Sequence, residues 1–215
     1  MKENLARRGD RKRSSLRKRG KHLTRNVKRE TSSLGLFAVY IHWSKAKRKQ
    51  SEVSQSTASR LRAMALIIVS GFPCSGRSTR VTELVSDFER RIASTSSAPV
   101  ARIQVISDAS VHNAKSCYKS QQAEKPARAS YLSAVTRAIA KDCITVADGG
   151  AGLNIKGFRY QLWCAAREEG VRCVSVQVHA PPDVCKRWNK ERRERGEGSY
   201  EEETMEEMLM RYEEP

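Results

Sequence analysis

The sequence predicts an α/β protein in which a parallel sheet is covered by helices on both faces, preceded by a disordered basic tail. From Met64 onward, short β-branched runs alternate with segments of helical periodicity. A glycine loop directly follows the first of these runs. Residues 1–63 hold 19 of the 41 Lys and Arg residues but only 4 of the 24 Asp and Glu residues, so residues 64–215 are close to neutral. We therefore divide the chain into a basic extension, 1–63, and a folded domain, 64–215.

The basic extension carries clustered like charge with little sustained apolar periodicity, which favours disorder. Its clusters are Arg11-Lys12-Arg13, Arg17-Lys18-Arg19 and the run from Lys45 to Lys49. Three interpretations remain open. The extension is a nuclear-localisation or RNA-binding arm, a solvated tail without a selected role, or a stretch that is not normally translated, since Met64 directly precedes the first strand.

Neither a membrane segment nor a secretory signal is expected. The apolar stretch Leu34–Trp43 falls short of the roughly 20 residues that a spanning helix needs, and the chain does not open with the order of a signal peptide. The six cysteines show no C-x-x-C pair and no histidine at a metal-ligand spacing. We expect a reducing compartment and no metal-thiolate site.

Four strands are predicted, each a short run rich in Val, Ile and other apolar residues. They are Ala65–Ser70, Arg102–Ser107, Cys143–Ala147 and Val171–Val178. Asp108 follows the second run and Asp148 follows the third. Carboxyl ends of parallel strands meet at one edge of a sheet, so these two aspartates are expected to lie near the same edge.

Helices are expected between and after the strands. The first follows the glycine loop and places apolar residues at the 3, 4, 7 spacing of one face: Val81, Leu84, Val85, Phe88 and Ile92. The second opens at Glu124-Lys125-Pro126, where proline is tolerated because its position needs no N–H donor. Its buried face is expected to contain Ala127, Tyr131, Ala134, Val135, Ala138 and Ile139.

Three further helices complete the prediction. One covers Lys156–Glu169 and is stopped by Gly170, and a basic one runs from Asp183 to about Arg195. The last follows Ser199-Tyr200-Glu201-Glu202, which reads as a capping box. Its apolar stripe is Met205, Met208, Leu209 and Tyr212, which we interpret as ordinary core packing.

The glycine loop is the strongest functional signal. It fits the phosphate-loop pattern G-x-x-x-x-G-[K]-[ST] with arginine in place of lysine, and it lies between a strand and a helix as that loop requires. The nucleotide-binding candidates are Gly71, Phe72, Pro73, Cys74, Ser75, Gly76, Arg77, Ser78 and Thr79. We therefore predict a kinase-like P-loop NTPase fold that binds a nucleoside triphosphate.

Several side chains could supply the chemistry at this loop. Ser78 is in position to coordinate Mg²⁺ from the first helical turn. Arg77 carries a bulkier, planar guanidinium where a lysine would reach between the β- and γ-phosphates, so transition-state stabilisation is affected more than binding. Asp148 is a candidate Mg²⁺ ligand or a cap of the next helix or turn. Asp108 is a candidate to orient the attacking group or a residue of turn chemistry.

The basic helix that begins at Asp183 is a candidate lid over the nucleotide phosphates. Cys185–Arg193 carries several cations, of which Arg192 and Arg193 would neutralise charge that develops during phosphoryl transfer. The alternative is a merely solvated face.

Several stretches resemble one family, the killer-toxin-insensitivity P-loop ATPases associated with the Elongator complex, which are related to phosphoseryl-tRNA(Sec) kinase. The resemblance is carried by Asn154–Cys164, with its distinctive I-K-G-F-R-Y-Q-L, by the loop, by Asn189-x-x-Arg192 and by the closing Arg211-Tyr212-Glu213-Glu214-Pro215. It covers most of 64–215. The family's C-terminal helical domain, implicated in tRNA binding, would begin about where this sequence ends, so we expect a C-terminally truncated member.

The resemblance implies an ATP-hydrolysing, tRNA-binding accessory factor of Elongator that acts in wobble-uridine modification. It implies ATP and Mg²⁺ as cofactors, held by the loop residues and Asp148. Asp108, Arg159, Asn189 and Arg192 would be secondary site residues. We expect Elongator and tRNA as partners, neither membrane nor DNA, and a cytoplasmic location with the nucleus as a second compartment.

Two alternatives to this ATPase remain. One is an RNA kinase of the phosphoseryl-tRNA kinase type, which would use the same nucleotide site. The other is a non-catalytic RNA-binding or scaffold relative, favoured by Arg77 in place of lysine.

Overall fold

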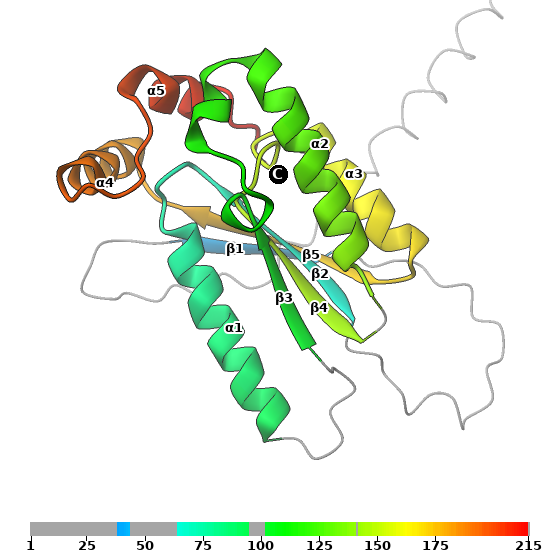
Figure 1. Ribbon diagram of the computed structural model, residues 1–215. Helices are drawn as coiled ribbons and strands as arrows, with labels where there is room; N and C mark the ends of the chain where they lie inside the picture. Colours follow the sequence, from blue (N-terminus) through cyan, green and yellow to red (C-terminus); the bar gives the residue numbers. More distant parts are fainter. Residues whose placement is uncertain (1–37, 44–63, 95–101, 141, 215) are drawn as a thin grey trace, which may run out of the picture.

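The structure is a computed structural model that describes residues 38–43, 64–94, 102–140 and 142–214 (Figure 1). Its strands are β1 (Ala38–Trp43), β2 (Ala65–Gly71), β3 (Arg102–Ser107), β4 (Cys143–Asp148) and β5 (Arg172–His179). Its α-helices are α1 (Arg77–Ala93), α2 (Gln121–Ala138), α3 (Lys156–Glu168), α4 (Pro182–Glu194) and α5 (Glu202–Met210). Two 3₁₀ turns, η1 (Ala109–Val111) and η2 (Lys115–Lys119), lie between β3 and α2.

The five strands form one sheet in the order β1-β5-β2-β4-β3. β2 is parallel to β4 and β5, and β3 is parallel to β4. Six of the seven residues of β2 and all six of β4 are buried, which explains why these strands read as continuous apolar runs rather than alternating ones. The predicted parallel sheet is confirmed.

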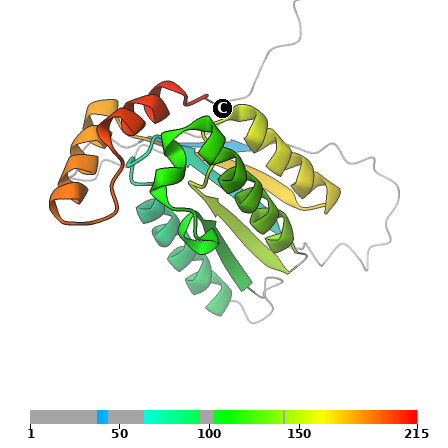
Figure 2. The ribbon, with the colours of Figure 1, turned by 45° about the horizontal axis from the view of Figure 1, so that its top comes forward.

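Helices cover both faces of this sheet, as predicted. Figures 1 and 2 show α1 on one face and α2 with α3 on the other. The α1 side is packed around Ile67, Val69, Val81, Ile144, Val146 and Val178. The opposite core includes Leu66, Ile68, Tyr131, Val135, Leu153 and Leu162.

Helices α4 and α5 lie beyond the carboxyl ends of the parallel strands (Figure 1). They enclose a third apolar cluster, which includes Tyr118, Cys185, Tyr200, Met205 and Met208. The methionine stripe is therefore core, as interpreted. The predicted capping box is wrong, because α5 starts only at Glu202 with Glu201 as its N-cap and no side-chain cap. The preceding Tyr200 is instead held in place by hydrogen bonds from α4.

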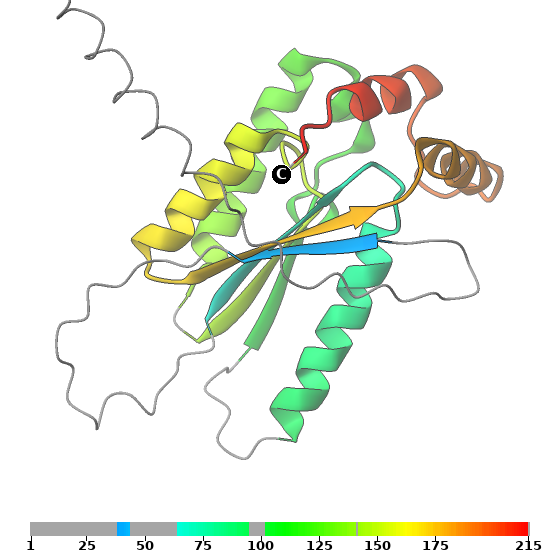
Figure 3. The same cartoon turned by 180° about the vertical axis from the view of Figure 1, so that it is seen from behind.

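The sequence-based expectation is also wrong for the start of α2 and for β1. α2 begins at Gln121 rather than at Glu124, because Ser120 caps it by accepting from the Ala123 N–H, so Pro126 lies inside the helix and not at its opening. Residues 38–43 lie in the segment predicted to be disordered, yet they pair antiparallel with β5 (Figure 3). The open edge of β5 offers unpaired N–H and C=O groups to a stretch of apolar and β-branched residues. The expectations for the rest of residues 1–63, including its basic clusters, fall outside the described residues. No helix in the described ranges is long and apolar enough to cross a membrane.

Candidate functional site

The phosphate loop begins at the end of β2, where its backbone passes close to the neighbouring strand β5. Gly71 has φ +149°, and a Cβ atom there would lie 2.2 Å from the carbonyl oxygen of Val178 in β5. Only glycine fits this approach. The loop then turns, with the Ser75 N–H donating to the Phe72 carbonyl at 3.2 Å, and ends at Gly76, the left-handed N-cap of α1.

The start of α1 presents unpaired backbone donors to the loop. The first turn of the helix contains no acidic residue, and the N-cap makes no side-chain hydrogen bond. Amide groups at a helix N-terminus have no partner within the helix, and together with the helix dipole they attract anions. Arg77, Ser78 and Thr79 form this turn, and Ser78 and Thr79 are exposed to the space in front of it. The segment therefore has the free amide groups and the positive helix terminus that a phosphate-binding loop requires.

Two buried oxygens of the site lack donors. Asp148 is only 7% exposed, and its Oδ1, like Oγ of the wholly buried Ser75, has no hydrogen-bond partner among the described residues. A buried carboxylate oxygen without a partner is costly. Asp148 does not cap α3, whose N-cap is Ile155. Its carboxylate fits a cation ligand, and Ser78 is the hydroxyl in the first turn of the neighbouring helix.

Arg77 leans across the end of β4. A Cβ atom on Gly149 would lie 2.7 Å from Cζ of Arg77, so the guanidinium rests directly on the backbone that follows Asp148. Gly149 itself has φ +55°. The planar group is accommodated because this position has no side chain. The arginine therefore points along the sheet edge that carries the loop and Asp148.

Asp108 is fully engaged with protein donors. Its Oδ1 accepts from Nδ2 of Asn113 and from the backbone N–H of Ala151, both at 3.1 Å, and its Oδ2 accepts from the Tyr118 hydroxyl. Burial and the Asp108 charge raise the pKa of Tyr118 well above its ordinary value. Asp108 thus ties the end of β3 to η2 and to the loop after β4. In this arrangement it is a positioning residue.

α4 closes over the phosphate loop through Asn189. This side chain, 4% exposed, accepts from the Tyr200 N–H and donates to the Tyr200 carbonyl, both at 2.8 Å. The Cys74 thiol donates to its Oδ1 at 3.6 Å. Asn189 thereby links the loop, the lid helix and the segment that leads to α5.

The two lid arginines point to different places. Arg193 donates to the Tyr200 carbonyl at 2.7 Å and so supports the lid. Arg192 faces Cys74, whose thiol pKa is raised by burial while Arg192, Lys115 and Arg77 act in the opposite direction. Three cations from three elements therefore lie near enough to one residue of the loop to act on its charge.

These features agree with known relatives. A model of the family described as chromatin associated protein KTI12 matches residues 64–215. The chain belongs to the KTI12 family. Protein kti12 of Schizosaccharomyces pombe is 37% identical over 154 residues, which cover 71% of this chain and 52% of that protein. The KTI12 homolog of Oryza sativa subsp. indica is 35% identical over 153 residues, covering 71% of this chain and 48% of the relative. This KTI12 chain thus spans about half the length of these curated relatives.

A solved KTI12 structure has the same fold. The crystal structure of Chaetomium thermophilum Kti12 in complex with ADP-AlF3 matches with a TM-score of 0.62 and 36% sequence identity, covering 70% of this chain and 81% of that one. The P-loop NTPase fold, which the phosphate loop and the alternation of strands and helices predict, is therefore confirmed.

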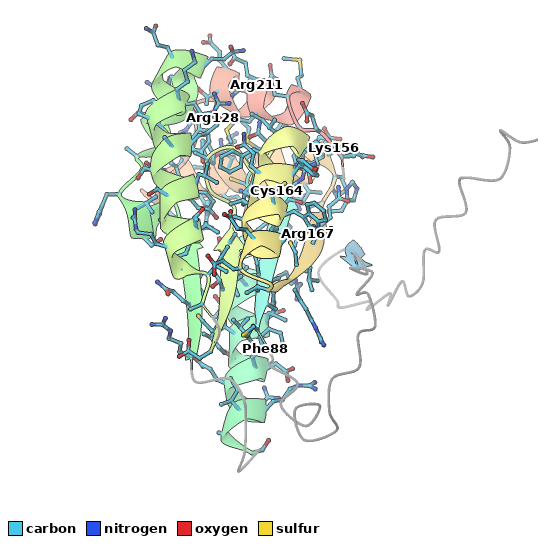
Figure 4. All side chains as sticks on the ribbon, turned by 90° about the vertical axis from the view of Figure 1, so that its right-hand side faces the viewer. Phe88, Arg128, Lys156, Cys164, Arg167 and Arg211 are labelled. Carbon is cyan, nitrogen blue, oxygen red and sulfur yellow. The ribbon has the colours of Figure 1, made fainter. Side chains whose placement is uncertain are left out.

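Arg159, expected as a secondary site residue from the family resemblance, reaches the loop of this KTI12 chain through Tyr212, because its Cζ is 5.8 Å from the Tyr212 ring and that ring packs against Phe72. It is 7% exposed and donates to the Leu153 carbonyl at 2.7 Å and to the Glu213 carbonyl at 2.6 Å. Glu213 also accepts from the Lys156 N–H at 2.5 Å (Lys156 is labelled in Figure 4). Arg159 holds the closing segment against α3.

Sequence reasoning missed four residues that line this KTI12 site. Tyr118 and Tyr200 are buried with ring centroids 5.7 Å apart, and Lys115 lies 4.7 Å from the Tyr200 ring. Tyr118 and Lys115 belong to an irregular stretch without periodicity or motif, so nothing local distinguishes them. Tyr212, whose ring is 5.1 Å from that of Phe72, could have been suspected from the family-like closing segment.

Proposed function

We propose that this chain binds ATP with Mg²⁺ at the phosphate loop and hydrolyses it. The observation that carries the proposal is the convergence, at one sheet edge, of an uncapped helix N-terminus, the Ser78 hydroxyl and a buried Asp148 oxygen without a donor. The ADP-AlF3 complex of the related Chaetomium protein supports it.

Ser78 and Asp148 would hold the Mg²⁺ ion. When bound, Mg²⁺ would offset the negative charge of the phosphates. The backbone amides of the loop and of the first turn of α1 would orient the phosphates. Arg77 and Arg192 would stabilise the charge that develops as water attacks the γ-phosphorus and the bond to the bridging oxygen breaks.

A kinase reaction is the less favoured alternative. It requires an acceptor hydroxyl to reach the phosphate and a base to orient it. The oxygens of Asp108 are already used by Tyr118, Asn113 and Ala151. A water molecule needs far less space beside the phosphate than an acceptor substrate does.

A non-catalytic binding role remains the second candidate, and Arg77 is the observation that favours it. A guanidinium is bulkier than an ammonium and fixed in its fork geometry. The Arg77→Lys variant separates the two. It should raise turnover if the chain is an ATPase and leave a scaffold's behaviour unchanged.

In the cell, we infer an accessory role with the Elongator complex and tRNA in wobble-uridine modification, in the cytoplasm with the nucleus as a second compartment. Membership of the KTI12 family supports this inference, and it rests on the family resemblance of the I-K-G-F-R-Y-Q-L stretch.

The decisive experiment is ATP hydrolysis by the full chain with Mg²⁺, in the presence and absence of total tRNA. We expect activity that rises with tRNA and is lost on adding EDTA. Asp148→Ala should abolish it, whereas Asp183→Ala, an exposed carboxylate in the first turn of α4, should leave it unchanged. ATP binding without hydrolysis would support the scaffold role, and no binding at all would refute the proposal.

A further inference from the structure

Lys115 is linked to the phosphate loop through Tyr200 and Asn189, although no phosphate-binding motif contains it. It belongs to η2, which lies next to α5 and in front of the carboxyl ends of the strands (Figure 2). Its Nζ donates to the carbonyl oxygen of Gly198, and it stands over the Tyr200 ring at 4.7 Å. Tyr200 is fixed by Asn189, which contacts Cys74 of the loop. A continuous set of contacts thus places the ammonium near the loop.

The groups that Lys115 contacts directly carry no charge. A carbonyl oxygen and a ring face are neutral, and no carboxylate lies within ion-pair distance of Nζ in the described ranges. Lys119, four residues further on, shows the contrast, since its Nζ pairs with Glu201 at 2.7 Å on the surface. Partial burial of an ammonium whose direct partners are neutral is unfavourable. Burial is accordingly the largest cause that lowers the pKa of Lys115; the Arg192 charge lowers it too, whereas Cys74 and Glu197 act in the opposite direction.

Lys115 and Arg192 are like charges that lie near the same residue of the loop. They come from η2 and α4, and both act on the Cys74 thiol. The nearby carboxylate, Glu197, is 3.6 Å from Arg192 but is bound more closely by Arg195, at 2.7 Å, and is about half exposed. Two like charges held on one side of a phosphate cradle favour an anion between them.

We infer that Lys115 binds the terminal phosphate of the nucleotide and supplies the compact positive charge that the phosphate loop lacks at Arg77. A standard loop provides this charge from its own lysine, which reaches the β- and γ-phosphates. Here the guanidinium of Arg77 rests on Gly149, and the ammonium approaches from η2 on the side of the lid. This inference rests on the proposed nucleotide function and assigns a residue to it.

The test compares a triphosphate with a diphosphate. Calorimetry would measure the Kd of the full chain with Mg²⁺ for AMP-PNP, a non-hydrolysable ATP analogue, and for ADP. Lys115→Met should weaken AMP-PNP binding by about tenfold or more, as expected for the loss of a charge-assisted contact to phosphate. ADP binding should change by less than about twofold, because ADP lacks the terminal phosphate. Lys119→Met is the matched control and should change neither affinity.

Each result decides the point. Equal loss of both affinities would mean that Lys115 only shapes the loop, and no loss would mean that it contacts no phosphate. Either outcome overturns the inference while the proposed function stands. A wild-type chain that binds neither nucleotide would overturn both. If Lys115→Met does not fold, Lys115→Arg and Lys115→Gln replace it, with arginine expected to retain AMP-PNP binding better than glutamine.

Discussion

The buried ion pair between Glu124 and Arg211 offers a quantitative test of the structure. Glu124 lies in the first turn of α2, and Arg211, labelled in Figure 4, directly follows α5. Nη1 of Arg211 is 3.0 Å from Oε2 of Glu124, and the two side chains are 27% and 1% exposed. Oε1 of Glu124 and Nε and Nη2 of Arg211 are buried without a hydrogen-bond partner in the described part of the chain. The pair is therefore strongly desolvated and incompletely satisfied.

The asymmetry of exposure predicts unequal effects of the two single substitutions. Arg211→Met leaves a carboxylate that water does not reach, so we expect a loss of about 3 kcal/mol in the free energy of unfolding, near the lower end for breaking a buried pair. For a chain of this size that corresponds to a fall of about 6–12 °C in Tm. Glu124→Gln leaves an arginine that can still be partly hydrated, so its cost should be about half as large. The double variant should recover part of the loss, because neither charge then remains unpaired.

Urea and thermal unfolding followed by circular dichroism would measure these differences. The matched control is Glu206→Gln, which breaks the surface pair of Lys186 and Glu206 at 2.8 Å, with side chains 45% and 53% exposed. It should change stability by less than about 0.5 kcal/mol. If Arg211→Met is as mild as Glu206→Gln, or if the single effects simply add in the double variant, the reasoning from burial is refuted.

Three other outcomes follow from particular contacts. Gly71→Ala drives a Cβ atom into a β5 carbonyl, so it should lower the free energy of unfolding in urea by about 3 kcal/mol and abolish nucleotide binding. The control Gly157→Ala, in open space on α3, should be neutral or stabilise the fold by up to about 1 kcal/mol. Asn189→Ala leaves a buried backbone N–H without its acceptor, so it should cost about 2 kcal/mol and speed hydrogen exchange at residues 196–201; unchanged exchange would contradict this role. With iodoacetamide at pH 8, the exposed Cys164 (Figure 4) should be alkylated well before Cys117. The reason is that burial and nearby carboxylates raise the pKa of the Cys117 thiol to about 11. Equal alkylation rates of the two thiols, measured by mass spectrometry, would contradict that environment.

The features that sequence reasoning predicted well are those encoded locally. The strand Arg102–Ser107 has the predicted bounds, because a short run of apolar and β-branched residues needs no distant partner to be recognised. The phosphate loop is likewise defined by glycines at fixed spacing. The same holds for the aspartates at the ends of β3 and β4, since chain order in a parallel sheet brings those ends together.

What could not be predicted depends on contacts between distant segments. The hydrogen bonds between the Asn189 side chain and the Tyr200 backbone determine where α5 starts, and they override a good local capping pattern at Ser199. β1 depends on the open edge of β5. Lys115 became a candidate only after the fold had brought η2 next to the lid, since its own neighbourhood in the sequence carries no periodic or motif signal.

The phosphate loop is braced from two sides, and this connects distant parts of the chain to the nucleotide site. On one side, Cys74 donates to Asn189 of α4. On the other, the Tyr212 ring packs against Phe72, and its hydroxyl donates to Oγ of Ser70 at 3.2 Å. Well-packed contacts of this kind do not deform continuously, so the loop cannot change shape without displacing the lid helix or the closing segment. Tyr212 thus packs directly against the phosphate loop, which gives the segment after α5 a part in the candidate site that its place in the sequence does not suggest.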